Sequence, residues 1–314
     1  MNVLVYGRLS EELQQMVVEA ANNHRVIFAN SEEDLVEEGT KADIFYGFCH
    51  EKMFQYLPNV KWIQSSSAGM DQQLFTALRN SEVILTNAAG LYATHVADQG
   101  FALLLGLARN IPSAVRNQDQ QIWGRLSRPL IEIGELTIGI VGMGGIGQQM
   151  AKRAKGFDMY VISVDAYRDG QVEAVDELMG IDQLPTLMQR SDVVMIACPL
   201  TEETHHLINA DQLARMKSTA CLINVARGPI VDESALIEAL RKGQIAAVGL
   251  DVTETEPLPS DSPLWSMDNV LITPHAAGQS QHRIRRATTF FCQNLKRYLD
   301  GEPLQNLVDK SLGF

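Results

Sequence analysis

Apolar residues recur along this chain in short runs separated by polar or glycine-containing segments, and this alternation predicts an α/β protein. Runs rich in Val, Ile and Leu predict buried parallel strands, whereas apolar residues at every third or fourth position predict helices. The expected strands cover residues 2–6, 25–29, 43–46, 61–64 and 83–86, then 138–141, 159–164, 192–197, 220–225, 245–250 and 270–273. The expected helices include residues 11–20, 94–109 and 281–299.

One of these strands runs directly into a glycine-rich turn. The sequence GMGGIG at 142–147 fits the pattern G-x-G-x-x-G. In this pattern Gly142 allows a tight turn, Gly144 lets a pyrophosphate approach the backbone, and Gly147 lets the next helix pack on the strand. The following strand ends at Asp165, where a dinucleotide fold places the acid that binds the adenosine ribose. A plain strand–turn–helix would share the local pattern, but the combination favours NAD binding.

Composition and charge exclude several classes of protein. With 314 residues the chain is long enough for two domains, and its 46% hydrophobic residues are typical of a globular protein. A net charge of −12 argues against nucleic acid or an anionic membrane as the main partner. The start of the chain lacks a signal-peptide pattern, and no apolar run is long enough to span a bilayer. The cysteines show no spacing typical of a metal site or a redox pair. We therefore expect a cytoplasmic protein without a metal.

Small and titratable residues follow two of the first strands, where an open α/β sheet builds its binding site. Residues 46–50 (YGFCH) are rich in aromatic and titratable side chains. Residues 65–71 (SSSAGMD) contain small residues whose backbone N–H groups can converge on an anion. Both segments could be surface turns, and the serine loop is the stronger functional candidate.

Three side chains near the ends of later strands are chemically matched: Arg227, Glu256 and His275. A guanidinium can hold a carboxylate through two parallel hydrogen bonds, and a histidine can give or take a proton near neutral pH. A glutamate bonded to that histidine would orient the ring and favour the imidazolium. Beside a nicotinamide, this set suits the interconversion of a 2-keto acid and a 2-hydroxy acid. From the pattern alone, each residue could also be an ordinary surface or salt-bridge residue.

Nearly the whole chain resembles the D-isomer-specific 2-hydroxyacid dehydrogenases. The stretches that carry the resemblance are SSAGMD at 66–71, TNAAGLYATHVAD at 86–98, VGMGGIG at 141–147, PLTEETHHLIN at 199–209, INVARGPIVDESALIEAL at 223–240, GLDVTETEPLP at 249–259 and SPLWSMDNVLITPHAAG at 262–278. The resemblance implies two Rossmann-like domains with the substrate in the cleft between them. A dinucleotide-binding domain at 96–279 would be inserted into a discontinuous, flavodoxin-like substrate domain at 1–95 plus 280–314. Within the family, the chain looks most like the glyoxylate/hydroxypyruvate reductase branch.

The resemblance also implies a role for each candidate residue. Arg227 would hold the substrate carboxylate, His275 would be the general acid/base, and Glu256 would be its partner. Asp251 would receive the nicotinamide carboxamide. The backbone expected to bind the substrate is that of Ser67, Ala68 and Gly69. The residues expected to bind the cofactor are Gly142, Gly144, Gly145, Ile146, Gly147, Asp165, Pro199, Thr204, Val225, Ala226, Asp251 and Gly278.

The choice of cofactor depends on Asp165. A carboxylate there would bond a free ribose and repel a 2′-phosphate, which favours NAD. Arg168 could partly accommodate that phosphate, so NADP stays an alternative. The sequence therefore predicts an NAD-dependent oxidoreductase acting on a small 2-keto or 2-hydroxy acid of the D-series.

Two further expectations concern partners and the pocket. The family usually forms homodimers through the nucleotide domain, and similarity suggests that Trp123 approaches the neighbouring subunit's site. The competing function is an NADH-sensing co-repressor of the same fold, whose output is protein contacts. The intact Arg, Glu and His set favours the enzyme. Candidate walls for the substrate side chain are Tyr46, Phe48, His50, Met70 and Trp265.

Overall fold

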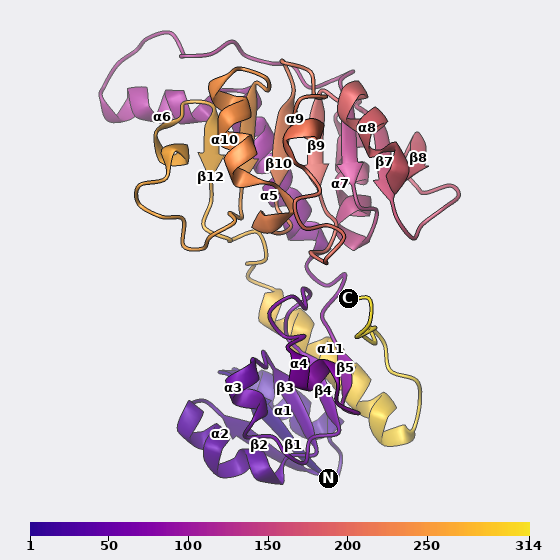
Figure 1. Cartoon of the computed structure of the whole chain (residues 1–314). Coiled ribbons are helices and arrows are strands. Elements are labelled where there is room, and N and C mark those ends of the chain that lie inside the picture. Colours follow the sequence, from indigo (N-terminus) through magenta and orange to yellow (C-terminus); the bar gives the residue numbers. More distant parts are fainter. The chain divides into compact units, whose positions relative to one another are not determined.

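A computed structural model describes all 314 residues and divides them into two compact units (Figure 1). One unit comprises Met1–Tyr92 and Ser280–Phe314, and the other comprises Ala93–Gln279. Each unit contains a parallel sheet with helices interleaved along the chain. The α/β class and the two Rossmann-like units predicted from the sequence are confirmed. No helix combines the length and the apolar composition that a membrane span requires.

The first unit is built on a five-stranded sheet in the order β2-β1-β3-β4-β5. This order is that of flavodoxin-like sheets. The strands are β1 (Asn2–Tyr6), β2 (Arg25–Ala29), β3 (Ile44–Gly47), β4 (Trp62–Ser65) and β5 (Ile84–Thr86). The helices are α1 (Glu11–Ala20), α2 (Glu32–Glu38), α3 (Glu51–Phe54), α4 (Thr76–Arg79) and α11 (Arg283–Asp300).

Side chains of this sheet alternate between two buried faces, as the pleat of a strand requires. Leu4, Phe45 and Ile63 join the apolar cluster that includes residues of α2, α3 and α4. On the opposite face, the ring of Trp62 stacks on Tyr298 of α11 at a centroid distance of 5.0 Å. The segment after α11 then returns to the sheet, where Leu307 forms an antiparallel bridge with Thr86 of β5.

The second unit contains a seven-stranded parallel sheet in the order β12-β11-β10-β9-β6-β7-β8. The strands are β6 (Thr137–Val141), β7 (Tyr160–Asp165), β8 (Glu177–Gly180), β9 (Val193–Ile196), β10 (Cys221–Asn224), β11 (Ala247–Leu250) and β12 (Val270–Ile272). The helices are α5 (Ala93–Ala108), α6 (Ile111–Asp119), α7 (Gly145–Gly156), α8 (Leu184–Arg190), α9 (Ala210–Leu213) and α10 (Glu233–Arg241). The strand order reverses between β6 and β9, and such switch points are where open α/β sheets bind ligands.

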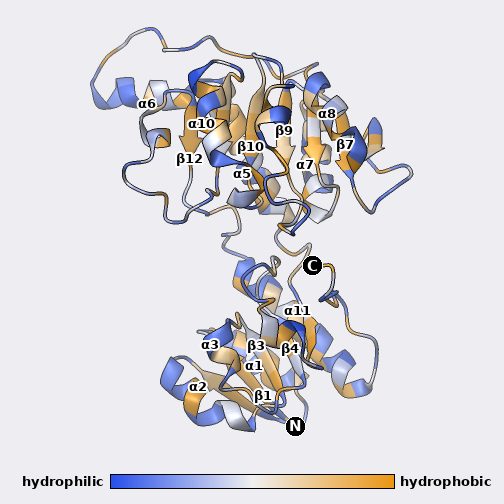
Figure 2. Cartoon of the chain, in the orientation of Figure 1, coloured by the Kyte–Doolittle hydropathy of each residue, from blue (hydrophilic) through white to orange (hydrophobic).

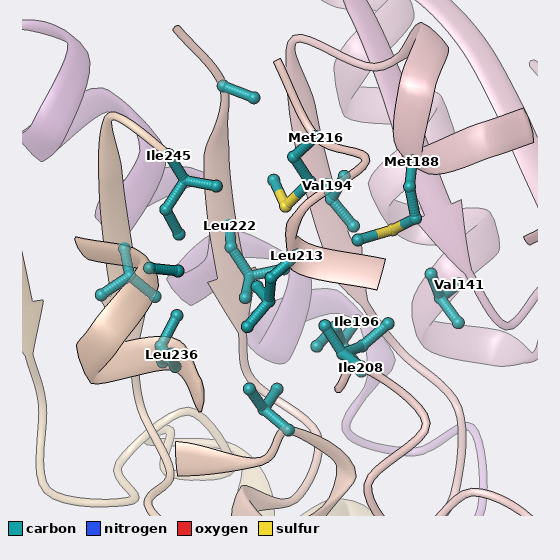
Figure 3. Close-up of a cluster of buried hydrophobic side chains, with 14 of the residues drawn as sticks. Val141, Met188, Val194, Ile196, Ile208, Leu213, Met216, Leu222, Leu236 and Ile245 are labelled. Carbon is teal, nitrogen blue, oxygen red and sulfur yellow. The ribbon is translucent and has the colours of Figure 1, made fainter. Parts of the chain in front are cut away.

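Apolar side chains fill one face of this second sheet (Figure 3). Val194 and Leu222 project from the strands toward Met188 of α8 and Leu236 of α10, and all four are almost fully buried. Figure 2 shows the same division along the chain, with hydrophobic strands and helices that carry hydrophilic outer faces. The central strands therefore hold their carboxyl ends in fixed positions at one edge of the sheet.

Helix α5 covers the opposite face of this sheet, and this burial explains why its sequence is mostly apolar. A Cβ added to Gly106 would lie 2.8 Å from the side chain of Leu271, and one added to Gly249 would lie 2.9 Å from Cβ of Leu103. These glycines let the helix lie directly on β11 and β12. The burial of α5 thus comes from the sheet and from α7 of its own unit.

The four cysteines are unpaired, and desolvation suppresses their ionisation. Burial raises the pKa of Cys49 and Cys198 to about 12, and that of Cys221 and Cys292 to about 11. Since the thiolate is the reactive species, we expect Ellman's reagent at mildly alkaline pH to leave all four thiols unmodified in the native chain. The same assay in guanidinium chloride should titrate all of them. A native thiol that reacts at the unfolded rate would contradict this account.

Candidate active site

The turn between β6 and α7 has the backbone that its glycines predict. Gly142 has φ +96°, a left-handed conformation that side chains rarely adopt, and a Cβ there would lie 2.6 Å from the backbone nitrogen of Cys198. A Cβ on Gly147 would lie 2.1 Å from the carbonyl oxygen of Gly142. A Cβ on Gly144 would meet nothing within 4 Å. The turn therefore leaves open space at Gly144, next to the first residue of α7, Gly145.

Gly147 and Gly144 give a matched pair of alanine substitutions. Gly147→Ala forces a methyl group against a backbone oxygen, so we expect it to lower the free energy of unfolding by about 3 kcal/mol. Gly144→Ala meets open space, so its stability should stay within about 1 kcal/mol of the parent chain. Its methyl group should nevertheless weaken NADH binding about tenfold, because it occupies the approach to the backbone. Urea unfolding and NADH fluorescence titration measure the two effects, and equal destabilisation by both changes would refute the assignment.

Asp165 lies at the carboxyl end of β7 and is already hydrogen-bonded to the backbone. Its Oδ2 accepts from the N–H of Met143 at 2.6 Å, and its Oδ1 accepts from the N–H groups of Tyr167 and Arg168 at 2.9 Å each. The carboxylate thus connects the glycine turn to its own loop. The sequence pattern predicted only ribose binding for Asp165 and did not indicate that it also holds the glycine turn.

The turn after β9 carries Pro199 and Thr204. The hydroxyl of Thr204 donates to the carbonyl oxygen of Pro199 at 2.7 Å and accepts from the N–H of Thr201 at 2.7 Å. These two bonds hold residues 199–204 in a compact turn. The turn lies beside the glycine turn, because β9 is hydrogen-bonded to β6. Gly278 lies in the segment after β12, and its carbonyl oxygen lies 3.1 Å from Nε2 of His95 on α5.

His275 and Glu256 form a direct pair at the carboxyl edge of the second sheet. Nδ1 of His275 lies 2.7 Å from Oε2 of Glu256, and the other carboxylate oxygen accepts from the N–H of Thr253 at 3.2 Å. Because an ionised carboxylate only accepts, Nδ1 carries the proton of this bond. Nε2 has no hydrogen-bond partner within the chain, and 43% of the His275 side chain is exposed. Nε2 is therefore the atom that can exchange a proton with a bound molecule.

Asp251 holds the loop on which His275 lies. The residue is buried; its Oδ1 accepts from the hydroxyl of Thr273 at 2.6 Å and from the N–H of Ala276 at 2.9 Å. Its Oδ2 accepts from the N–H of Ala277 at 2.8 Å, and its backbone carbonyl accepts from the N–H of His275 at 2.7 Å. His275 itself has φ +49°. The sequence did not predict this role of Asp251, because only the fold shows that these backbone groups converge on one carboxylate.

Arg227 follows β10, the strand between β9 and β11. Its Nη1 donates to the carbonyl oxygen of Ala226 at 2.8 Å, and its own carbonyl accepts from the side chain of Asn224 at 2.9 Å. A Cβ on the next residue, Gly228, would lie 1.9 Å from the carbonyl oxygen of Thr253. The loop that carries Arg227 therefore packs directly against the loop that leads to Glu256. The preceding residues of the turn, Val225 and Ala226, are buried.

The serine loop belongs to the first unit and follows β4. The N–H of Ser67 donates to Oγ of Ser65 at 2.9 Å, so this amide is already used. The amides of Ala68 and Gly69 have no hydrogen bond within the chain. Of the three residues expected to present N–H groups, only these two have amides that remain available.

The candidate pocket walls divide into two groups. Tyr46 is buried against α11, with its ring stacked 4.3 Å from that of Phe291, and Met70 belongs to the core. His50 caps α3, where its Nδ1 accepts from the N–H of Met53. The expectation that Tyr46 and Met70 line a pocket is wrong, because both are buried in the core of the unit, whereas His50 stays exposed. Phe48 and Trp265 remain exposed.

Comparison with known proteins adds independent information. The sequence model of the family described as "D-isomer specific 2-hydroxyacid dehydrogenase, NAD binding domain" matches residues 101–277. The chain is 37% identical over 267 residues to a protein named glyoxylate reductase from Korarchaeum cryptofilum, covering 83% of this chain and 80% of that one. It is 36% identical over 320 residues to glyoxylate/hydroxypyruvate reductase B of Escherichia coli, covering 98% of each chain.

A solved structure of similar fold carries a bound dinucleotide. It is an NADPH-dependent glyoxylate/hydroxypyruvate reductase from Sinorhizobium meliloti in complex with NADP and sulfate. The match has a TM-score of 0.85 and 26% sequence identity, and it covers 100% of this chain and 99% of that one.

Proposed function

The chain belongs to the D-isomer-specific 2-hydroxyacid dehydrogenase family, and from that premise we propose that it reduces a small 2-keto acid, of the size of glyoxylate or hydroxypyruvate, to the D-2-hydroxy acid with NADH. Membership makes the chain an NAD(P)-dependent oxidoreductase acting on 2-hydroxy acids. The observation that carries the proposal is the hydrogen-bonded pair of His275 and Glu256 on a loop braced by Asp251. The co-repressor alternative finds no support, because the relatives named above are reductases.

In this proposal each residue of the site has one task. Arg227 holds the substrate carboxylate, and its planar fork orients the adjacent carbonyl. Nε2 of His275 donates a proton to the carbonyl oxygen as the carbonyl carbon is reduced. Glu256 keeps the imidazole ring oriented and stabilises the imidazolium that donates the proton. The overall balance is one keto acid, one hydride and one proton to one hydroxy acid.

The second unit contains a fitting place for the dinucleotide. The open space at Gly144 and the first N–H groups of α7 suit a pyrophosphate, which helix N-termini favour. Gly145, Ile146, Val225, Ala226, Pro199, Thr204 and Gly278 are the other residues that we assign to its binding. When bound, the reduced nicotinamide supplies the hydride.

NAD is the proposed cofactor because of the charge at Asp165. A carboxylate at the ribose position disfavours the 2′-phosphate of NADP. The Sinorhizobium meliloti relative is described as NADPH-dependent, and the exposed Arg168 keeps NADP as the alternative here. Comparing kcat/KM for NADH and NADPH distinguishes the two. A higher value with NADPH would reverse the proposed preference.

The deciding experiment follows NADH oxidation with glyoxylate, hydroxypyruvate, pyruvate and a bulky aromatic 2-keto acid. We expect turnover of the small acids and a product of D configuration. Tight NADH binding without turnover of any 2-keto acid would sink the proposed reaction and leave a dinucleotide-binding protein.

A second copy of the chain is the proposed partner. Exposed apolar side chains gather on α6 and the segment after it: Ile111 is 50% exposed, Val115 48%, Ile122 51%, and Trp123 is fully exposed. A groove of about 490 Å³ between α5 and α6, lined by Gly106, Ile111 and Val115 among others, adjoins them. Large exposed apolar patches mark interaction surfaces. Sedimentation velocity should give a dimer that Val115→Glu dissociates, whereas a monomeric parent chain would refute this assembly.

A cytoplasmic location is part of the proposal, supported by the four unpaired cysteines.

A further inference from the structure

Three successive carbonyl groups of the serine loop are bonded from one neighbouring segment, residues 87–92. The carbonyl oxygen of Ser66 accepts from the hydroxyl of Tyr92 at 2.6 Å, and that of Ser67 accepts from the N–H of Ala88 at 2.9 Å. The carbonyl oxygen of Ala68 accepts from Nδ2 of Asn87 at 3.1 Å. Three successive peptide groups are thus held by their oxygens. Holding them in this way fixes the direction of the two amides, those of Ala68 and Gly69, that remain without a partner.

Asn87 is the centre of this arrangement. The residue is 5% exposed. Its Oδ1 accepts from the N–H of Ala89 at 3.0 Å, and its Nδ2 donates to the carbonyl oxygen of Ala68. Its backbone carbonyl accepts from Nε2 of Gln64 at 3.1 Å. Every polar atom of the side chain is used, so the orientation of Asn87 determines where the carbonyl of Ala68 lies.

Asn306, in the tail after α11, holds Asn87 from the other side. The N–H of Asn87 donates to the carbonyl oxygen of Asn306 at 3.1 Å. Nδ2 of Asn306 donates to the carbonyl oxygen of Ala89 at 2.8 Å and to that of Asn87 at 3.4 Å. Asn306 has φ +53°, a left-handed conformation that asparagine tolerates better than most residues.

A buried amide network fixes the tail in turn. Asn294 of α11, fully buried, exchanges two hydrogen bonds with the backbone of Gln305: its Nδ2 donates to the carbonyl at 3.0 Å and its Oδ1 accepts from the N–H at 2.9 Å. The same Nδ2 donates to Oε1 of Gln64 at 2.9 Å. Gln64 also reaches Asn87, so the network closes on itself. Buried polar groups that are all satisfied hold one geometry.

We propose that Asn306 is a positioning residue for the carboxylate-binding loop, acting through Asn87. The proposal rests on the proposed function, in which the free amides of Ala68 and Gly69 bind the substrate carboxylate. A tail residue more than 200 positions away in the sequence thereby sets the affinity for the 2-keto acid. Neither the chemistry at His275 nor the dinucleotide site involves these contacts.

The test uses Asn306→Gly in the full chain. Glycine keeps the left-handed backbone and removes only the side-chain bonds. The matched control is Asn22→Gly, because Asn22 lies in the same unit with φ +54° and makes no side-chain hydrogen bond, although it is exposed and Asn306 is half-buried. Asn306→Asp is the second variant: it keeps the shape and replaces the donor by an acceptor that faces two carbonyl oxygens.

The readout separates positioning from general damage. We expect Asn306→Gly to raise KM for the 2-keto acid, and Ki for the non-reacting analogue oxamate, by about threefold to tenfold. Its kcat and its NADH affinity should stay at the parent values, and Asn306→Asp should raise KM at least as much. Asn22→Gly should change none of these quantities.

Two failures are distinguishable. If the parent chain reduces 2-keto acids and Asn306→Gly has the KM of Asn22→Gly, the positioning role of Asn306 is refuted while the proposed function stands. An equal fall of kcat and NADH affinity in Asn306→Gly would also refute it, because that pattern reports general loss of structure. If the parent chain neither reduces nor binds any 2-keto acid, the proposed function fails and this inference fails with it.

Discussion

Replacing Arg227 by alanine is expected to lower kcat/KM for every 2-keto acid by about 10³-fold to 10⁵-fold. A site built to hydrogen-bond a substrate group loses discrimination of this size when the pairing is removed, and charge-assisted, two-pronged bonds are the strongest of these. The loop of Arg227 packs against the loop that leads to Glu256, so the side chain can be removed without opening a core cavity. Steady-state kinetics with glyoxylate and hydroxypyruvate measure the loss.

Two comparisons make this result specific. Arg227→Lys keeps the charge but loses the planar fork, so it should recover only part of the activity. Arg241→Ala removes an arginine whose visible partner is Glu238, one turn earlier on α10, and should leave kcat/KM unchanged. NADH affinity should be equal in all three variants. Activity within tenfold of the parent chain in Arg227→Ala would remove this residue from carboxylate binding.

Replacing His275 by glutamine is expected to lower kcat by about 10²-fold to 10⁴-fold, the usual contribution of a general acid. Glutamine keeps a polar side chain of similar length on the loop that Asp251 holds, but it has no imidazole nitrogen to carry the transferred proton. NADH affinity and KM for the keto acid should change little. Single-turnover measurements of NADH oxidation isolate the chemical step, and His24→Gln, outside the second unit, is the control.

The pH dependence of the reduction rate is a further test of His275 as the acid. Reduction consumes a proton held by the imidazolium, so its rate should fall as pH rises and that proton is lost. Glu256→Gln removes the carboxylate that lies 2.7 Å from Nδ1 and orients the imidazole ring, so it should lower kcat while NADH affinity stays at the parent value. A reduction rate that stays flat well above neutral pH, with the chemical step limiting, would exclude His275 as the acid.

Secondary structure was largely predictable, because it depends on short-range pattern. Strand β1 has the predicted bounds and β10 differs by one residue at each end, since runs of β-branched and apolar residues were enough to place them. Strand β8 and helix α6 are among the elements that were missed. The edge strand β8 is half-exposed and carries only four residues, ELMG, and α6 is polar over most of its length. Strand β8 has no apolar alternation, and the apolar residues of α6, Ile111, Ala114 and Val115, span only one helical turn.

The sequence by itself determined the α/β class, the glycine turn at 142–147 and the residue types available for catalysis. These follow from local chemistry: the period of burial and the backbone freedom of glycine depend only on residues close in the chain. Only the tertiary structure decided which groups meet. It bound the carboxylate of Asp251 to the backbone of the His275 loop, used the amide of Ser67 internally, and stacked Tyr46 on Phe291 of α11. Such contacts depend on strand order and loop packing, which the whole sheet sets and no single stretch encodes.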